Sequence, residues 1–213
     1  MTLLTSVGKK SATAIINCLR GAGVKNLRFV NETCVSGATL ERFPGHLKKI
    51  KDSGINTIID FRQEASSQFA EACEKSGLRY ILFPLEHTRS GLSGISSAGQ
   101  VGEISDDFVK QLKDFMDIIN EGNAYMGCNF GIDRTNLGLV FNYLLNSKSQ
   151  LPPKILTWGD FRTKSVINKT LKIARKIIKR MTPEQKAYLG IPENYNEIFQ
   201  EKISRMLASN LYS

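Results

Sequence analysis

The sequence predicts an α/β fold in which a central, mainly parallel sheet is flanked by helices and followed by a helical C-terminal extension. Short apolar runs suited to buried strands alternate with amphipathic segments along the first two thirds of the chain. Two of the predicted helices end at a Ser-Gly pair, a common place for a helix to stop. After Asn146 the pattern changes, and Pro152 and Pro153 mark a boundary. The 213 residues suffice for one domain with a substantial core and an extension.

The first part of the chain alternates between helical and extended segments. We expect a short helix within Gly8–Arg20, a strand at Leu27–Val30, an extended or turn segment at Asn31–Ala38 and a helix at Arg42–Lys51. Ser53 and Gly54 follow the last of these and end it.

The middle of the chain carries the segments most typical of a parallel sheet. The expected elements are a buried strand at Asn56–Phe61, a helix at Glu64–Lys75, a strand at Arg79–Phe83 and an amphipathic helix at Phe108–Ile119, which Ser105 or Asp106 caps. A long loop rich in Gly and Ser, Glu86–Gly102, separates the last two, and loops of this length are commonly functional. Strands alternating with helices favour a sheet that is covered on both faces.

The last third is predicted to be helical. Ile167–Met181 is amphipathic, Thr182 to Gln185 resembles a helix start with Pro at the first position, and Glu193–Leu211 is the expected terminal helix. We therefore expect a core in residues 1–150, including a short N-terminal helix, and an extension in residues 151–213 that packs on it.

One loop combines the residues of a thiol-based anion site. Cys128 lies six positions before Arg134, Gly131 stands between them, and Thr135 follows the Arg. An apolar strand candidate leads in, and a long apolar helix candidate, Leu137–Leu145, leads out. A strand, a tight loop and a helix N-terminus form a cradle for an anion, because backbone N–H groups and the helix dipole point into the loop.

Each residue type suits phosphate chemistry. Cys128 would be a thiolate nucleophile, and the planar guanidinium of Arg134 matches two phosphate oxygens. Thr135 can hydrogen-bond the sulfur and help it to leave. The loop residues predicted to bind phosphate are Asn129, Phe130, Gly131, Ile132, Asp133 and Arg134. The alternative interpretation is a buried strand-end cysteine and a surface arginine.

At these residues the chain resembles the cysteine-dependent phosphatase superfamily of protein tyrosine and dual-specificity phosphatases, with the signature H-C-x-x-G-x-x-R-S/T. Gly127 replaces the His of that signature. Gly54–Glu64 and Tyr80–Leu85 are similar to the "G-I-x-T-V-I-D-L-R-x-E" and "Y-x-x-I-P" strands of compact members, so the resemblance covers about residues 27 to 147. It implies a phosphotyrosine phosphatase-like fold and hydrolysis of phosphomonoesters through a phosphocysteine.

The resemblance also implies a general acid, commonly an Asp on the loop after the "I-P" strand, where this chain has none before Asp106. Asp133 is the first candidate, because myotubularin-like phosphatases carry their acid at that loop position and Sac-type enzymes have a similar Asp-Arg-Thr run. Glu86 and then Asp106 follow, although Asp106 also suits a helix cap. The alternative role for Asp133 is to hold the loop by hydrogen bonds.

Two substrate classes remain open, a phosphorylated protein and an inositol lipid or inositol phosphate. The loop lacks the lysines with which some phosphoinositide enzymes hold extra phosphates, which argues against a highly phosphorylated substrate. The Asp-Arg-Thr resemblance and the basic helix argue for one, and protein substrates come first only because they are the commoner class. A phosphate-binding pseudophosphatase is a further alternative, since the signature His is absent.

Charge and composition limit which partners and which compartment are expected. The net charge of +9 favours anionic partners, and the basic helix at 167–181 could bind an anionic membrane surface or simply face water. We expect no metal, because the four cysteines show no ligand spacing. We also expect no cofactor and no nucleic-acid partner. No signal peptide or membrane span is recognisable. A cytoplasmic, reducing compartment is therefore expected, with delivery into another cell left open.

Overall fold

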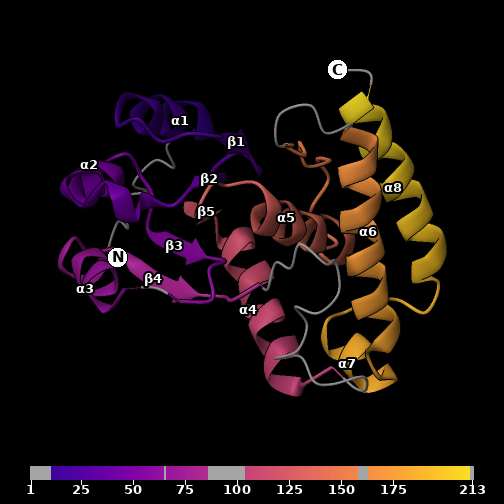
Figure 1. Cartoon of the computed structure of the whole chain (residues 1–213). Helices are drawn as coiled ribbons and strands as arrows, with labels where there is room; N and C mark the ends of the chain where they lie inside the picture. Colours follow the sequence, from indigo (N-terminus) through magenta and orange to yellow (C-terminus); the bar gives the residue numbers. More distant parts are fainter. Residues whose placement is uncertain (1–10, 65, 86–103, 158–162, 212–213) are drawn as a thin grey trace, which may run out of the picture.

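A computed structural model describes residues 11–64, 66–85, 104–157 and 163–211. Its centre is a five-stranded sheet in the order β1-β2-β5-β3-β4 (Figure 1). The strands are β1 (Arg28–Phe29), β2 (Val35–Ala38), β3 (Thr57–Asp60), β4 (Arg79–Leu82) and β5 (Ala124–Cys128). Within the described sheet β1 and β2 pair antiparallel, and every other neighbouring pair is parallel. The predicted α/β class with a mainly parallel sheet is therefore confirmed.

Three helices cover one face of the sheet: α1 (Ala12–Gly21), α2 (Leu47–Asp52) and α3 (Ser67–Lys75). Their apolar sides, for example Ile15, Ile50 and Phe69, share one buried cluster with Ile58 and Tyr125 of the sheet. Figure 1 shows these helices together on the side of the sheet away from α4 and α5.

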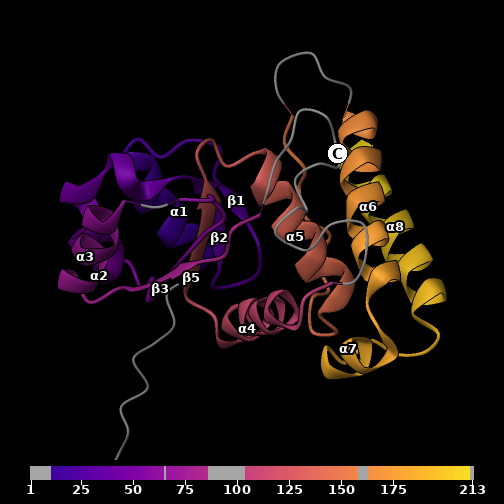
Figure 2. The same ribbon diagram turned by 60° about the horizontal axis from the view of Figure 1, so that its bottom comes forward.

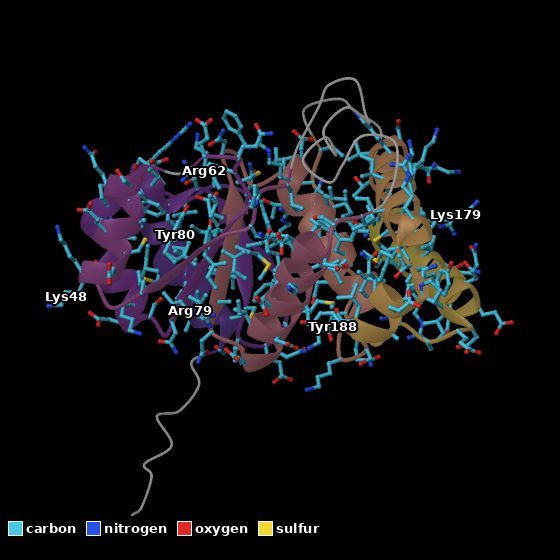
Figure 3. All side chains as sticks on the ribbon, turned by 90° about the horizontal axis from the view of Figure 1, so that it is seen from below. Lys48, Arg62, Arg79, Tyr80, Lys179 and Tyr188 are labelled. Carbon is cyan, nitrogen blue, oxygen red and sulfur yellow. The ribbon has the colours of Figure 1, made fainter. Side chains whose placement is uncertain are left out.

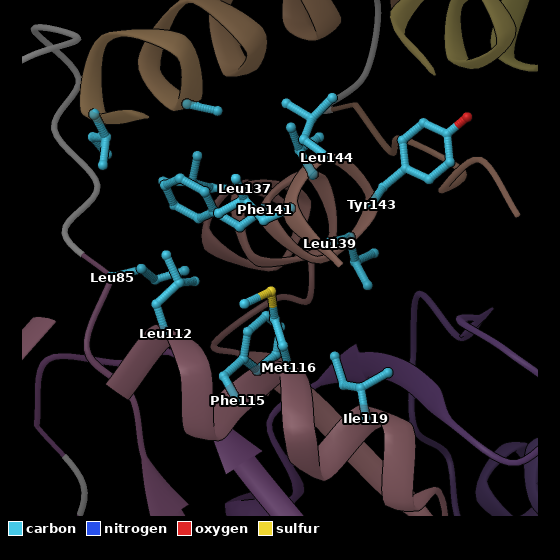
Figure 4. Packing of buried hydrophobic residues seen from close by; sticks show 14 of the residues in the cluster. Leu85, Leu112, Phe115, Met116, Ile119, Leu137, Leu139, Phe141, Tyr143 and Leu144 are labelled. Atoms are coloured by element: carbon cyan, nitrogen blue, oxygen red, sulfur yellow. The ribbon is translucent and has the colours of Figure 1, made fainter. Parts of the chain in front are cut away.

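The other face is covered by α4 (Asp106–Glu121) and α5 (Asp133–Leu145). Phe115 and Met116 of α4 point toward Leu139 and Phe141 of α5 (Figure 4). Every residue of α5 from Thr135 to Leu145 is buried. The helix is buried on all sides because it lies between the sheet layer and the C-terminal helices (Figure 2).

The C-terminal region forms α6 (Thr163–Arg180), α7 (Pro183–Tyr188) and α8 (Tyr195–Leu211). Residues of α6 and α8 belong to the same buried cluster as α4 and α5, so the region packs on the sheet domain through α5. Thr182 and Gln185 form a reciprocal capping box at the start of α7, with Pro183 in the first turn. None of the helices in the described part of the chain has the length and apolar character to cross a membrane.

Two segments differ from the sequence-based expectation. The segment 31–38, expected to be extended or a turn, contains the full strand β2, which lies next to the central strand β5. The helix expected at Arg42–Lys51 is instead two short 3-10 turns, η1 (Leu40–Arg42) and η2 (Pro44–His46), followed by α2. Pro44 explains this difference, since its ring disfavours the helical conformation of the preceding residue, and Phe43 has a φ of −131° and a ψ of 45°. The long loop expected at Glu86–Gly102 lies outside the described residues.

Candidate active site

The site is built at the carboxyl end of the central strand. Cys128 is the last residue of β5 and is 5% exposed. It lies opposite Ala38 of β2, and the preceding Gly127 lies between Gly37 of β2 and Asp60 of β3. The chain then turns into α5, as Figure 2 shows. This is the edge at which α/β sheets bind ligands.

The loop after Cys128 is tight and depends on glycine. Gly131 has a φ of +69°, in the left-handed region that only glycine adopts readily. A side chain there would also collide with the backbone of Gly37. The Gly131 N–H donates to the Cys128 carbonyl at 3.2 Å, and α5 begins two residues later, at Asp133. The loop therefore ends at the N-terminus of a long helix, whose first N–H groups and dipole favour an anion.

Thr135 contacts the sulfur directly. Its Oγ1 donates a hydrogen bond to Cys128 Sγ at 3.3 Å, and its side chain is fully buried. This contact stabilises negative charge on the sulfur, because the hydroxyl is a donor that burial shields from water.

Arg134 is half-buried in the first turn of α5. Its Nε is buried and has no hydrogen-bond partner among the described residues. Burying such a donor without a partner is costly, so an arginine in this state is suited to an anion. Asn129 and Phe130, by contrast, are exposed at the rim of the loop, and Arg42 lies 5.6 Å from the Phe130 ring centroid.

The packing of β2 explains why a histidine does not precede the cysteine. A Cβ on Gly127 would lie 2.6 Å from the Gly37 carbonyl oxygen and 3.3 Å from the Tyr125 ring. The buried Tyr125 hydroxyl donates to the Ala38 carbonyl in the same place. No side chain fits at position 127 unless β2 moves.

The three candidate acids are differently placed. Asp133 is half-buried at the first position of α5, beside Arg134. Asp106 begins α4, and its Oδ1 accepts a hydrogen bond of 2.8 Å from Gln185 Nε2 of α7. In Figure 2, α7 lies at the bottom, whereas the turn from β5 into α5 lies at the top. Glu86 is outside the described residues.

Two residues that the sequence analysis did not identify donate hydrogen bonds to backbone carbonyls of the loop. Asn26 Nδ2 donates to the Phe130 carbonyl at 2.7 Å. Arg28 of β1, only 3% exposed, donates to the carbonyl of the next residue, Gly131. Burial lowers the pKa of Arg28 to about 10, against an opposing contribution from Cys128. The available sequence signal was a charged residue inside the otherwise apolar strand candidate Leu27–Val30.

Arg62, at the end of β3, belongs to a separate ion-pair network. It pairs with Asp60 at 2.5 Å and with Glu41, and the Tyr80 hydroxyl donates to Asp60 at 2.9 Å. Figure 3 shows Arg62 and Tyr80 on the sheet side of the molecule. No cluster of three or more His, Cys, Asp or Glu side chains suited to a metal exists in the described part of the chain.

Comparisons with known proteins give a likeness in structure only. No family model and no curated protein matches the chain. A structure described as a phosphatase (DUF442) from Shewanella putrefaciens CN-32 is similar at 12% identity with a TM-score of 0.48, covering 76% of this chain and 98% of that one.

Two further structures are similar. TpbA of P. aeruginosa matches at 13% identity with a TM-score of 0.42, covering 84% of this chain and 91% of that one. The core catalytic domain of the PP-IP phosphatase SIW14 of S. cerevisiae matches at 12% identity with a TM-score of 0.41, covering 87% and 92% respectively. Likeness at this level does not identify an activity.

Proposed function

We propose that the protein is a phosphatase that hydrolyses phosphomonoesters through a phosphocysteine intermediate. The observation that carries the proposal is the Thr135 hydroxyl bonded to the Cys128 sulfur at the base of the loop. Arg134 follows in the first turn of α5, and its Nε is buried without a partner among the described residues. Backbone N–H groups of the loop and of the first turn of α5 would bind the remaining phosphate oxygens.

The reaction needs two displacements at phosphorus. Cys128 Sγ attacks the phosphorus, the bond to the ester oxygen breaks, and a general acid protonates the leaving oxygen. Water then attacks the phosphocysteine, loses its proton to the same group acting as a base, and releases phosphate. The Cys128 thiolate departs with the Thr135 hydroxyl donating to it. Arg134 clamps the equatorial oxygens in both steps.

We propose Asp133 as the general acid, with Glu86 and Asp106 as the alternatives in that order. Asp133 directly precedes the guanidinium that would hold the phosphate, and it is only half-buried, so substrate can reach it. Asp106 already accepts a hydrogen bond from Gln185, which is consistent with a role in joining α4 to α7.

For the substrate we propose a phosphorylated protein, with tyrosine or dual specificity, ahead of a phosphoinositide or inositol phosphate. The loop from Cys128 to Arg134 contains no lysine that could hold additional phosphates. A panel of phosphopeptides, inositol phosphates and phosphoinositides separates the two classes. Turnover of no member of the panel would favour a phosphate-binding pseudophosphatase.

The central test replaces the nucleophile. We expect Cys128→Ser to abolish hydrolysis of an aryl phosphate while inorganic phosphate still binds. Arg134→Lys should lose most activity and bind phosphate more weakly, because a point charge cannot replace the two-pronged donor. Undiminished turnover by the Ser variant would contradict the mechanism, and near-normal turnover by the Lys variant would contradict the clamp.

We further propose that α6 attaches the protein to an anionic membrane surface. The helix has seven Lys or Arg residues and no Asp or Glu among its 18 residues. Lys169, Lys172 and Lys179 are exposed, and Figure 3 shows Lys179 pointing outward. Each basic residue close to an anionic bilayer contributes roughly 1 kcal/mol. Binding to vesicles containing phosphatidylserine, lost on replacing these lysines with Gln, supports the proposal; equal binding to neutral vesicles contradicts it.

A further inference from the structure

Arg28 is a buried cation whose hydrogen-bond partners are neutral. Its Nη1 donates to Asn136 Oδ1 at 2.6 Å and to the Lys154 carbonyl at 3.1 Å, and its Nη2 donates to the Gly131 carbonyl. None of the ion pairs in the described part of the chain includes Arg28. Its Nε is buried without a partner among the same residues. A buried charge without a counterion is destabilising, so the fold retains Arg28 at a cost.

The site cysteine is a titratable group that can carry a compensating charge. Arg28 and Cys128 interact electrostatically, and the Cys128 charge opposes the lowering of the Arg28 pKa that burial causes. Tyr125 of β5 interacts electrostatically with Cys128, Arg28 and Asp60, and Asp60 of β3 lies opposite Gly127. Asp133 and Arg134 follow the cysteine at the start of α5. Burial raises the Tyr125 pKa well above its usual value, so this phenol stays neutral and does not compensate Arg28.

The contact with Gly131 also sets the direction of a loop peptide group. In a trans peptide the C=O and the following N–H point in opposite directions. Because Arg28 binds the Gly131 carbonyl, the Ile132 N–H points away from Arg28. Asn26 holds the preceding carbonyl, that of Phe130, from the same segment of chain. The loop backbone is thus anchored through two successive carbonyls.

We infer that Arg28 is a positioning residue of the candidate active site, which orients the Gly131–Ile132 peptide and supplies the buried positive charge that stabilises anionic states of Cys128. This inference rests on the proposed thiolate chemistry. It identifies the group that supports the loop where Gly127 leaves no room for a side chain. Asn136 extends the same network, since its Nδ2 donates to the Leu156 carbonyl at 2.8 Å.

The test measures the reactivity of the sulfur without any substrate. Alkylation of Cys128 by iodoacetamide is followed against pH by peptide mass spectrometry, in the wild type and in Arg28→Met and Arg28→Lys. We expect the pH profile of the alkylation rate to move to higher pH in the Met variant. Each pH unit of this shift lowers the alkylation rate near pH 6.5 by about tenfold. The Lys variant, which keeps the charge, should lie between the two.

The matched control is Arg62→Met, which also removes a buried arginine at this edge of the sheet. Arg62 is already paired with Asp60 and Glu41, so its loss should lower the urea midpoint and leave the alkylation profile unchanged. An Arg28→Met variant that is merely less stable, with a wild-type profile, would overturn the inference. If Arg28→Met does not fold, Arg28→Lys provides the test. A wild-type alkylation profile in Arg28→Lys, together with phosphate binding as strong as in the wild type, would also overturn the inference.

A second readout is the thermal stabilisation by inorganic phosphate. We expect phosphate to raise the Tm of the wild type more than that of Arg28→Met, because a bound anion stabilises the buried cation. Equal shifts would contradict the role of the charge. Both readouts are separate from turnover. If the wild type hydrolyses no phosphomonoester but the Arg28 profiles shift as stated, the proposed activity fails and the role of Arg28 stands.

Discussion

Gly127 of β5 lies directly opposite Gly37 of β2, and a Cβ on Gly127 would come within 2.6 Å of the Gly37 carbonyl oxygen. Because neither glycine has a side chain, the Tyr125 side chain fits beside both of them, and its hydroxyl donates to the Ala38 carbonyl. The residue before Cys128 is therefore determined by packing between two strands.

Introducing a histidine at position 127 should destabilise the protein. We expect Gly127→His and Gly127→Ala each to lower the free energy of unfolding by about 1–3 kcal/mol, because the added atoms overpack β2. Urea denaturation measures this. Gly21→Ala is the control, because nothing lies within 4 Å of a Cβ there, and it should leave stability unchanged or slightly raised. A Gly127→His variant that is stable and more active would contradict the packing argument.

Removing the Thr135 hydroxyl should slow the breakdown of the phosphocysteine. Thr135→Val keeps the shape of the buried side chain but removes the donor to Cys128 Sγ. A hydrogen bond to a charged group contributes about 1.5–3 kcal/mol, so kcat should fall by roughly 10- to 150-fold. Rapid-quench measurements should show a burst of leaving group followed by a slow steady state. Thr135→Ser should behave almost like the wild type, and a normal rate in the Val variant would exclude this role.

Replacing Asp133 should remove the requirement for a protonated acid. We expect Asp133→Asn to lose about 10²–10⁴-fold in turnover of a phosphoester with a poor leaving group and far less with a nitrophenyl phosphate. The alkaline limb of the pH–rate profile should disappear as well. Glu86→Gln and Asp106→Asn are parallel variants. An Asp133→Asn protein that only binds substrate more weakly would transfer the assignment to one of these two.

Stability should fall at alkaline pH because of a buried thiol. Burial, with a smaller contribution from Asp60, raises the pKa of Cys73 to about 12. The unfolded chain releases this proton near pH 9, so from about pH 9 to 12 the unfolded state binds fewer protons and the free energy of unfolding decreases. Between pH 9 and 10 the expected slope is about 1 kcal/mol per pH unit.

Urea denaturation of Cys73→Ala at pH 8, 9 and 10 checks this contribution. The variant should be less stable at pH 8, because a buried side chain is lost, but its stability should depend less on pH. Cys18→Ala, at a partly exposed position, serves as the control. Parallel pH curves for the wild type and Cys73→Ala would show that Cys73 is not responsible.

The order of helices and strands was largely predictable, since periodicity and Ser-Gly helix ends are local features. The predicted strand at Asn56–Phe61 corresponds to β3, and the helix at Phe108–Ile119 lies within α4. The strand β2 was predicted only as part of an extended or turn segment, because Ser36 and Gly37 interrupt the apolar pattern. Its position beside β5 depends on small residues that admit Tyr125, which a linear pattern does not show.

The candidate nucleophile, clamp and hydroxyl could be read from the sequence because they lie within one stretch of eight residues, and a strand–loop–helix turn brings such residues together by short-range geometry alone. Arg28 could not be recognised in this way, because it lies 103 positions from Gly131, the residue whose carbonyl it binds. The same holds for Asp106, whose partner Gln185 is 79 positions away. The sequence by itself thus determined which atoms could perform the chemistry at the loop. Only the pairing of β2 with β5, and of β1 with β2, decided which buried charge supports that loop and why no histidine does, because both depend on close contacts between segments that are distant along the chain.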